Sequence, residues 1–149
     1  MHLTRFTDLG LRTLMLLSAG ESQERRITTR TIASGANASE HHVAKAVSKL
    51  AELGMVHARR GRIGGLVLTD AGRNASIGWL VRELEGDREV IECGGDSPCP
   101  LIAACRLRRV LADAKEAFYR ELDRYTVTDL TADNRLPIVL QLTTEGNPR

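Results

Sequence analysis

The sequence predicts a mainly α protein with a small β-hairpin and a long helix toward its C-terminal end. Three observations support this fold class. Apolar residues recur at steps of three and four along several segments, as they do on one face of a helix. Two short β-prone runs flank a glycine-rich stretch, as in a hairpin. All three cysteines fall in the window ECGGDSPCPLIAAC, whose glycines and prolines are typical of a loop.

The charge of the chain is divided unevenly between its halves. The 149 residues suit one ordinary domain, or a small domain with an appended arm. Residues 1–73 carry 11 Lys and Arg against 6 Asp and Glu, a net charge of +5. Residues 74–149 carry 10 against 13, a net charge of −3. The basic first half therefore indicates binding to a polyanion.

The sequence contains no candidate membrane span. The longest apolar run near the start, Leu14–Leu17, is far shorter than the roughly 18 residues that a span needs. Asp8 and Arg12 interrupt any secretory signal. We therefore expect a cytoplasmic protein with no membrane partner. In that reducing compartment, clustered cysteines are more often metal ligands or redox groups than structural disulfides.

Two helices are predicted at the start of the chain. The first is expected over residues 7–18, and Gly20 should end it. Thr28 or Thr29 can cap a second, short helix, which Gly35 stops.

A longer third helix is expected to start at Ser39, its N-cap candidate, and to close at Gly54. Its apolar stripe consists of Val43, Val47, Leu50 and Leu53. A short helix, a tight turn and a longer helix form a helix-turn-helix pattern, which other small helical bundles can also show.

A basic hairpin is predicted next. Strands are expected near residues 55–58 and 66–69, joined by a tip at 59–65 that carries Arg59, Arg60 and Arg62 among glycines. Glycine allows the backbone to approach a phosphate or a narrow groove closely, and arginine supplies charge there. Thr69 or Asp70 then caps a further helix. We interpret residues 1–73 as a winged helix-turn-helix DNA-binding domain.

The third helix is expected to enter the major groove of duplex DNA by its N-terminal end. Its lysines suit phosphates, whereas its serine and histidines can reach base edges. A solvated polar face is the alternative for Lys49 and Glu40. The predicted DNA-contacting residues are Thr28, Thr29, Ser39, His41, His42, Lys45, Lys49, Arg59, Arg60 and Arg62.

The second half is predicted to form an arm. A helix is expected over residues 75–84, with Trp79 as a packing anchor, and Pro100 should start a long helix that ends near Tyr125. That helix has more apolar face than one small domain needs, so we expect it to pack against its twin in a homodimer. Folding back onto its own domain is the alternative. The expected boundaries are a linker helix and cysteine loop at 74–106, the end of the dimerisation helix at 107–127 and a C-terminal segment at 128–149, with a disordered tail at 143–149.

The cysteines Cys93, Cys99 and Cys105 are separated by five residues each. Thiolates gathered near a helix N-terminus bind soft metals. Structural zinc usually uses closely spaced pairs, which are absent from this window. The spacing therefore favours an iron–sulfur cluster over zinc, and zinc over a redox disulfide.

Three motifs together carry a resemblance to a known family. The start MHLTRFTDLGLR, the stretch RRGRIGG and the C-x5-C-x5-C pattern ahead of a long helix resemble the bacterial iron–sulfur winged-helix transcriptional regulators, over roughly residues 1–125. The resemblance implies a homodimeric transcription factor whose DNA affinity depends on a 4Fe–4S cluster. It also implies that Cys93, Cys99 and Cys105 ligate that cluster.

The fourth cluster ligand distinguishes branches of this family. One branch has a histidine three residues after the third cysteine, where this chain has Arg108, and no histidine follows His57. The sequence thus looks more like the nitric-oxide-sensing repressors of the family. The resemblance then implies a non-cysteine ligand. We favour Asp8 from the other subunit, oriented by Arg12 one turn on, over Asp96 or a small molecule.

The sequence-based prediction is a nitric-oxide-responsive repressor that binds a double-stranded DNA operator as a homodimer. An iron or redox sensor on the same scaffold and a structural-zinc DNA-binding protein are the alternatives. A thiol redox enzyme is disfavoured, because the chain lacks a CxxC pair and a phosphate-binding glycine loop.

Overall fold

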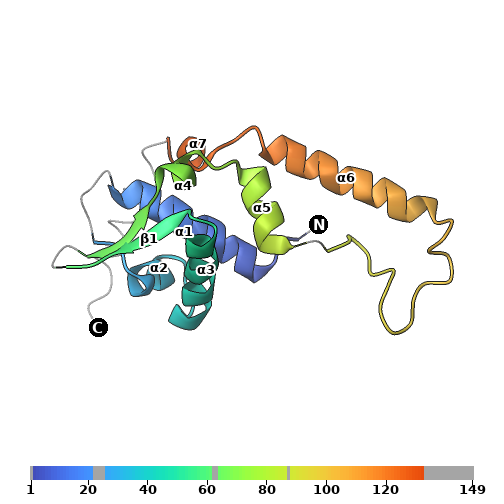
Figure 1. Ribbon diagram of the computed structural model, residues 1–149, viewed down its shortest axis with the longest axis horizontal. Coiled ribbons are helices and arrows are strands. Elements are labelled where there is room, and N and C mark those ends of the chain that lie inside the picture. Colours follow the sequence, from blue (N-terminus) through green and yellow to red (C-terminus); the bar gives the residue numbers. More distant parts are fainter. Residues whose placement is uncertain (1, 22–25, 62–63, 87, 133–149) are drawn as a thin grey trace.

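The core of the computed structural model surrounds its first helix and is built from residues of both halves of the chain (Figure 1). The structure describes residues 2–21, 26–61, 64–86 and 88–132, so Arg62 and the predicted tail lie outside the described residues. In chain order the elements are α1 (Arg5–Glu21), α2 (Thr29–Gly35), α3 (Glu40–Glu52), β1 (Val56–Arg59), β2 (Gly65–Leu68), α4 (Asp70–Asn74), α5 (Ile77–Glu85), α6 (Arg106–Leu122) and α7 (Val127–Thr131).

Helix α1 packs against α3, α5 and α7 through buried leucines that include Leu9, Leu14 and Leu17. The prediction that Gly20 ends this helix is wrong, because α1 continues to Glu21. A Cβ on Gly20 would lie 2.0 Å from Cδ1 of Ile27. The glycine thus allows a close approach of the next segment rather than a helix end.

Helices α2 and α3 form the predicted helix-turn-helix. Thr28 caps α2 by accepting a hydrogen bond from the backbone N–H of Thr31 at 3.2 Å. Ser39 caps α3 in the same way through the N–H of His42, at 3.3 Å. Asn37 lies in the turn between the two helices with φ of 49°, in the left-handed region that asparagine tolerates. The predicted caps are therefore confirmed.

The predicted wing is also present. Strands β1 and β2 pair antiparallel, in a register that runs from Val56 opposite Leu68 to Arg59 opposite Gly65. The backbone N–H of Leu66 donates to the carbonyl of Ile27 at 2.8 Å, which joins the wing to the start of the helix-turn-helix.

Two predictions about the second half are wrong. Trp79 is 37% exposed and does not anchor α5, whose buried residues include Leu80, Val81 and Leu84. Pro100 does not start α6, because residues 100–104 form turns and the helix begins at Arg106. The segment turns instead through 3.1 Å backbone bonds from Ile102 to Cys99 and from Ala104 to Leu101.

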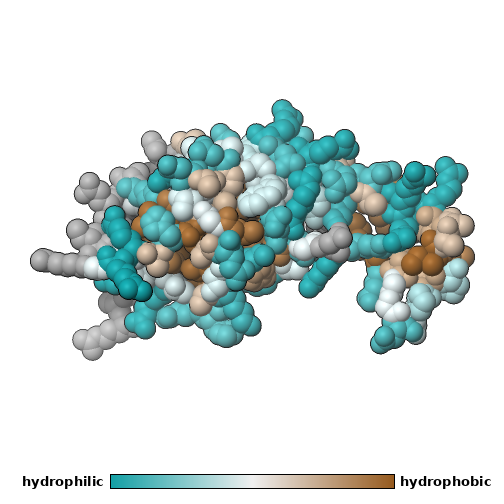
Figure 2. All heavy atoms as spheres, in the orientation of Figure 1, coloured by the Kyte–Doolittle hydropathy of each residue, from teal (hydrophilic) through white to brown (hydrophobic). Residues whose placement is uncertain are grey.

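Helix α6 extends away from the body, and the cysteine loop lies at its far end (Figure 1). Tyr119 and Leu122, near the end of α6, pack with the core, whereas Leu107 and Val110 near its start are 59% and 60% exposed. Brown, apolar side chains accordingly gather both in the body and at the far end (Figure 2). Among the described residues, no helix combines the length and apolar character needed to cross a bilayer.

Candidate functional site

One candidate surface is the N-terminal half of α3. Ser39, His41, His42 and Lys45 are exposed there, and Lys49 is half-buried. Glu40 pairs with Arg30 of α2 at 3.0 Å, so its carboxylate tethers the two helices of the helix-turn-helix. The exposed serine, histidines and lysine remain on the face that such a helix presents to a major groove.

The wing tip and the start of α2 flank this helix. Arg59 and Arg60 are exposed, next to Gly61 with φ of 108°, a conformation that glycine adopts at little cost. The Thr28 hydroxyl contacts the N–H and hydroxyl of Thr31, so it serves the cap, and Thr29 is the half-buried first residue of α2. The local geometry therefore favours the arginines over the threonines as nucleic-acid contacts.

The second candidate site is the cysteine loop between α5 and α6. Cys93 is buried, whereas Cys99 and Cys105 are half-buried. The backbone N–H of Cys99 donates to the carbonyl of Cys93 at 3.1 Å, which folds the loop back on itself. Cys105 is the N-cap residue of α6, but its side chain makes no capping bond. Its thiol thus lies at the helix end that stabilises negative charge.

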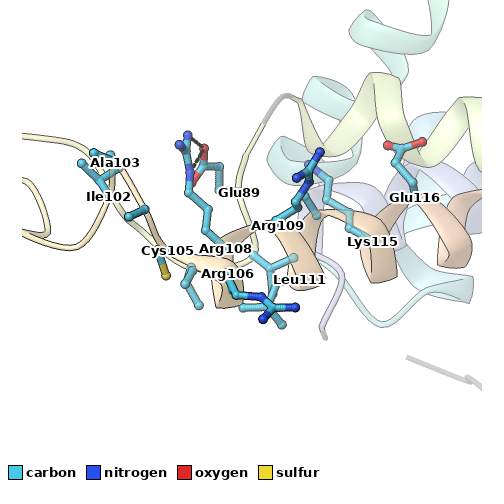
Figure 3. Close-up of a pocket in the computed structure, with 14 residues that line it drawn as sticks. Glu89, Ile102, Ala103, Cys105, Arg106, Arg108, Arg109, Leu111, Lys115 and Glu116 are labelled. Carbon is cyan, nitrogen blue, oxygen red and sulfur yellow. Dashed lines mark hydrogen bonds and ion pairs between the residues drawn. The ribbon is translucent and has the colours of Figure 1, made fainter.

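An ion pair ties this loop to α6. Nε of Arg108 donates to both carboxylate oxygens of Glu89 at 3.0 Å, and Nη2 also contacts Oε1 (Figure 3). This hydrogen bonding holds the pKa of Glu89 below its usual range. Burial raises the pKa of the Cys93 thiol, and the Glu89 carboxylate raises it further. The pairing of Arg108 with Glu89 was not predicted from the sequence, because 19 residues separate the two.

An open pocket lies beside the loop, between it and α6. Its lining includes Glu89, Ile102, Cys105, Arg108 and Leu111. Figure 3 shows the Cys105 sulfur at the start of the helix, with the Arg108 and Glu89 side chains directed toward one another. The pocket therefore combines one thiol with charged and apolar groups.

Asp8 lies in α1, and Figure 1 shows the cysteine loop well away from that helix. The Asp8 carboxylate accepts a hydrogen bond from Nη1 of Arg5 at 2.7 Å and another from Nε of Arg12 at 2.6 Å. Arg12 thus contacts Asp8 as expected, while Arg5 was missed although its i,i+3 spacing is a signal of such a pair. Asp96 is exposed in the loop. Within the described part of one chain, no three His, Cys, Asp or Glu residues are grouped so that they could hold a metal ion.

Comparison with known proteins places this architecture in context. The family model Rrf2, described as an iron-dependent transcriptional regulator, matches residues 3–133. The HTH-type transcriptional repressor NsrR of Streptomyces coelicolor is 56% identical over 143 residues, which cover 96% of this chain and 97% of that protein. The HTH-type transcriptional regulator NsrR of Geobacillus kaustophilus is 40% identical over 135 residues, covering 89% and 91%.

Solved structures agree with the fold. The structure of CymR, the global cysteine regulator of B. subtilis, covers 89% of this chain and 97% of its own at 26% identity and a TM-score of 0.63. These similar proteins are regulators rather than enzymes, in agreement with the prediction that the chain is not an enzyme. The family model, which matches most of the chain, and the two relatives show that this chain belongs to the Rrf2 family of transcriptional regulators.

Proposed function

We propose that this chain is a nitric-oxide-responsive transcriptional repressor of the cytoplasm. It binds a double-stranded DNA operator as a homodimer, and its affinity depends on a 4Fe–4S cluster. One observation carries the proposal. The same chain has an exposed basic face on its helix-turn-helix and a loop with three cysteines at the end of a protruding helix. The 56% identity to a repressor named NsrR supports the same reading.

The DNA-binding part of the proposal rests on α3 and the wing. Lys45, Arg59 and Arg60 supply exposed positive charge for phosphates, and His41 and His42 lie near the helix start that faces base edges. Two copies present two such helices, which matches the two half-sites of a symmetric operator. The exposed apolar start of α6 supports pairing of the copies.

The donor set of the loop fits an iron–sulfur cluster. The loop carries three thiols, those of Cys93, Cys99 and Cys105, and thiolates are the usual ligands of such clusters. The fourth ligand in this proposal is Asp8 of the other subunit, whose carboxylate accepts hydrogen bonds from Arg5 and Arg12 on the exposed side of α1. When bound, the cluster would supply an iron held by carboxylate rather than thiolate and hence open to nitric oxide.

The residues of the chain have separate tasks in this proposal. The thiolates of Cys93, Cys99 and Cys105 would bind the cluster. The Glu89–Arg108 pair holds the loop against α6. Arg12 orients Oδ1 of Asp8. Because Asp8 belongs to the helix-turn-helix body and the cysteines to the arm, occupancy of the site links the arm of one subunit to the DNA-reading body of the other.

Anaerobic purification tests this function. We expect about four irons and four sulfides per chain, a visible spectrum that changes on addition of nitric oxide, and operator binding that weakens in parallel. Cys99→Ala should lose both iron and the nitric-oxide response. One zinc per chain and no colour would show a structural zinc site instead. A Cys99→Ala variant that bound the operator as tightly as wild type and still responded to nitric oxide would contradict the proposal.

A further inference from the structure

Arg5 contacts two parts of the molecule that the proposed switch has to connect. Its Nη1 donates to Oδ2 of Asp8 at 2.7 Å. Its Nη2 donates to the backbone carbonyl of Asn37 at 3.3 Å. Asn37 lies in the turn of the helix-turn-helix, two residues before Ser39, the N-cap of α3. One guanidinium therefore bridges the candidate cluster ligand and the entry to the recognition helix.

The second arginine on Asp8 has a different environment. The hydrogen bond described for Arg12 runs from Nε to Oδ1 of Asp8 at 2.6 Å, one turn further along α1. Two guanidinium groups thus share one carboxylate, and the contact with the turn comes from Arg5. The planar fork of arginine suits this bridge, because it presents donors to two acceptors at fixed angles.

Packing beneath Arg5 joins the same two helices. Arg5, Phe6 and Leu9 of α1 line a small pocket together with His42 and Lys45 of α3. Leu9 is only 1% exposed, so the floor of this pocket is part of the core. Because α1 also packs against α3, a change at Arg5 lies next to the residues at the start of the recognition helix.

We propose that Arg5 is a positioning residue that transmits the state of Asp8 to the recognition helix. This inference rests on the proposed function. In the present arrangement Arg5 divides its donors between the Asp8 carboxylate and the Asn37 carbonyl. If the Asp8 carboxylate served as a ligand, one of the two oxygens that now accept from Arg5 and Arg12 would be shared with iron, and the arginines would compete for the other. Arg5 then binds the Asn37 carbonyl more strongly and fixes the turn that orients α3.

The test compares operator affinity of cluster-loaded and cluster-free protein for wild type, Arg5→Gln and Arg30→Gln. Arg30 is the matched control, because it also contacts the start of α3, through Glu40 at 3.0 Å, without touching Asp8. We expect Arg5→Gln to reduce the loaded-to-free affinity ratio about tenfold at unchanged iron content. Arg30→Gln should shift both affinities together and leave the ratio as in wild type.

Arg5→Lys separates positioning from charge. A lysine retains the positive charge but lacks the fork, so we expect the ratio to fall as in Arg5→Gln. If Arg5 merely contacted a DNA phosphate, Arg5→Gln would weaken both states equally and lower the salt dependence of binding, and Arg5→Lys would behave like wild type. That result would overturn the inference.

Amide hydrogen exchange gives a readout that is independent of DNA. In wild type, the amides of residues 37–42 should exchange more slowly when the cluster is present, and in Arg5→Gln the difference should be lost. If wild type switches but Arg5→Gln keeps the wild-type ratio and exchange pattern, only the role of Arg5 is wrong. If wild type holds no cluster or shows a ratio of one, the proposed function fails, and the inference fails with it.

Discussion

At the scale of single residues, Asp123 secures the joint between the body and the arm. Its Oδ1 accepts from the Ser76 hydroxyl at 2.6 Å, and its Oδ2 accepts from Nη1 of Arg82 at 2.8 Å. The bond from Ser76, followed by that from Arg82, holds the pKa of Asp123 below its usual range. One carboxylate at the end of α6 therefore fastens it to both the cap and the middle of α5.

We expect Asp123→Asn to lower the free energy of unfolding by about 1 kcal/mol, near the low end for charge-assisted bonds because water screens the partly exposed side chain. The pKa of Asp123 is lower in the folded protein than in the unfolded chain. This stabilisation is therefore complete above the aspartate pKa of the unfolded chain, about 3.9, and is lost as pH falls through the pKa of the folded protein. Urea unfolding at pH 7 and at pH 3 measures the difference. Glu83→Gln, at an exposed position of α5, is the control and should lower the free energy of unfolding much less at pH 7. Equal losses in the two variants would contradict the argument.

At the scale of elements, glycines inside helices set how closely the helices approach. A Cβ on Gly78 of α5 would lie 2.3 Å from the backbone oxygen of Tyr119 and 2.3 Å from Oδ1 of Asp123. A Cβ on Gly10 of α1 would lie 2.7 Å from Cδ1 of Leu84, the far end of a flexible side chain. The contact between α5 and α6 therefore depends on a missing side chain, and backbone atoms there cannot move aside.

Gly78→Ala should destabilise the protein by about 2 kcal/mol, because the cost of overpacking exceeds the helix propensity gained from alanine. Gly10→Ala should cost less, since the Leu84 side chain can shift. Denaturant unfolding of both variants checks the order. A smaller loss for Gly78→Ala than for Gly10→Ala would show that α5 and α6 can separate easily.

At the scale of the whole molecule, α6 carries exposed apolar side chains along much of its length. Leu107, Val110 and Phe118 are 59%, 60% and 37% exposed, and their spacing places them on one side of the helix. Only the later part of α6 contributes to the core of its own chain, through Tyr119 and Leu122. A second copy of α6 is the proposed cover for this face.

Val110→Glu should weaken self-association at least about tenfold, because a charge left in an apolar interface costs more than the roughly 1.4 kcal/mol that a tenfold change represents. Ala112→Glu is the control, since Ala112 is exposed and projects about 160° away from Val110 around the helix. Sedimentation velocity over a range of concentrations distinguishes them. Unchanged dimers in Val110→Glu would exclude this face as the interface.

Elements that depend on neighbouring residues could be predicted from the sequence. The caps Thr28 and Ser39 and the paired strands of the wing follow from spacing and residue type within a few positions. The outcomes at Gly20 and Trp79 could not be predicted, because they depend on how the returning Ile27 segment approaches α1 and on which face of α5 the core covers. The start of α6 was missed because Pro100 suits a first helical turn but also suits the tight turns that are formed.

The sequence by itself determined the helix-turn-helix, the wing and the grouping of three thiols in one loop, since all of these are encoded locally. The tertiary structure alone decided which groups meet across the chain. It brings Arg5 to the carbonyl of Asn37, 32 residues away, and Arg108 to Glu89, 19 residues away. It also leaves the start of α6 without a cover in its own chain among the described residues. Such contacts depend on how helices pack, and packing is a property of the assembled core rather than of any local pattern.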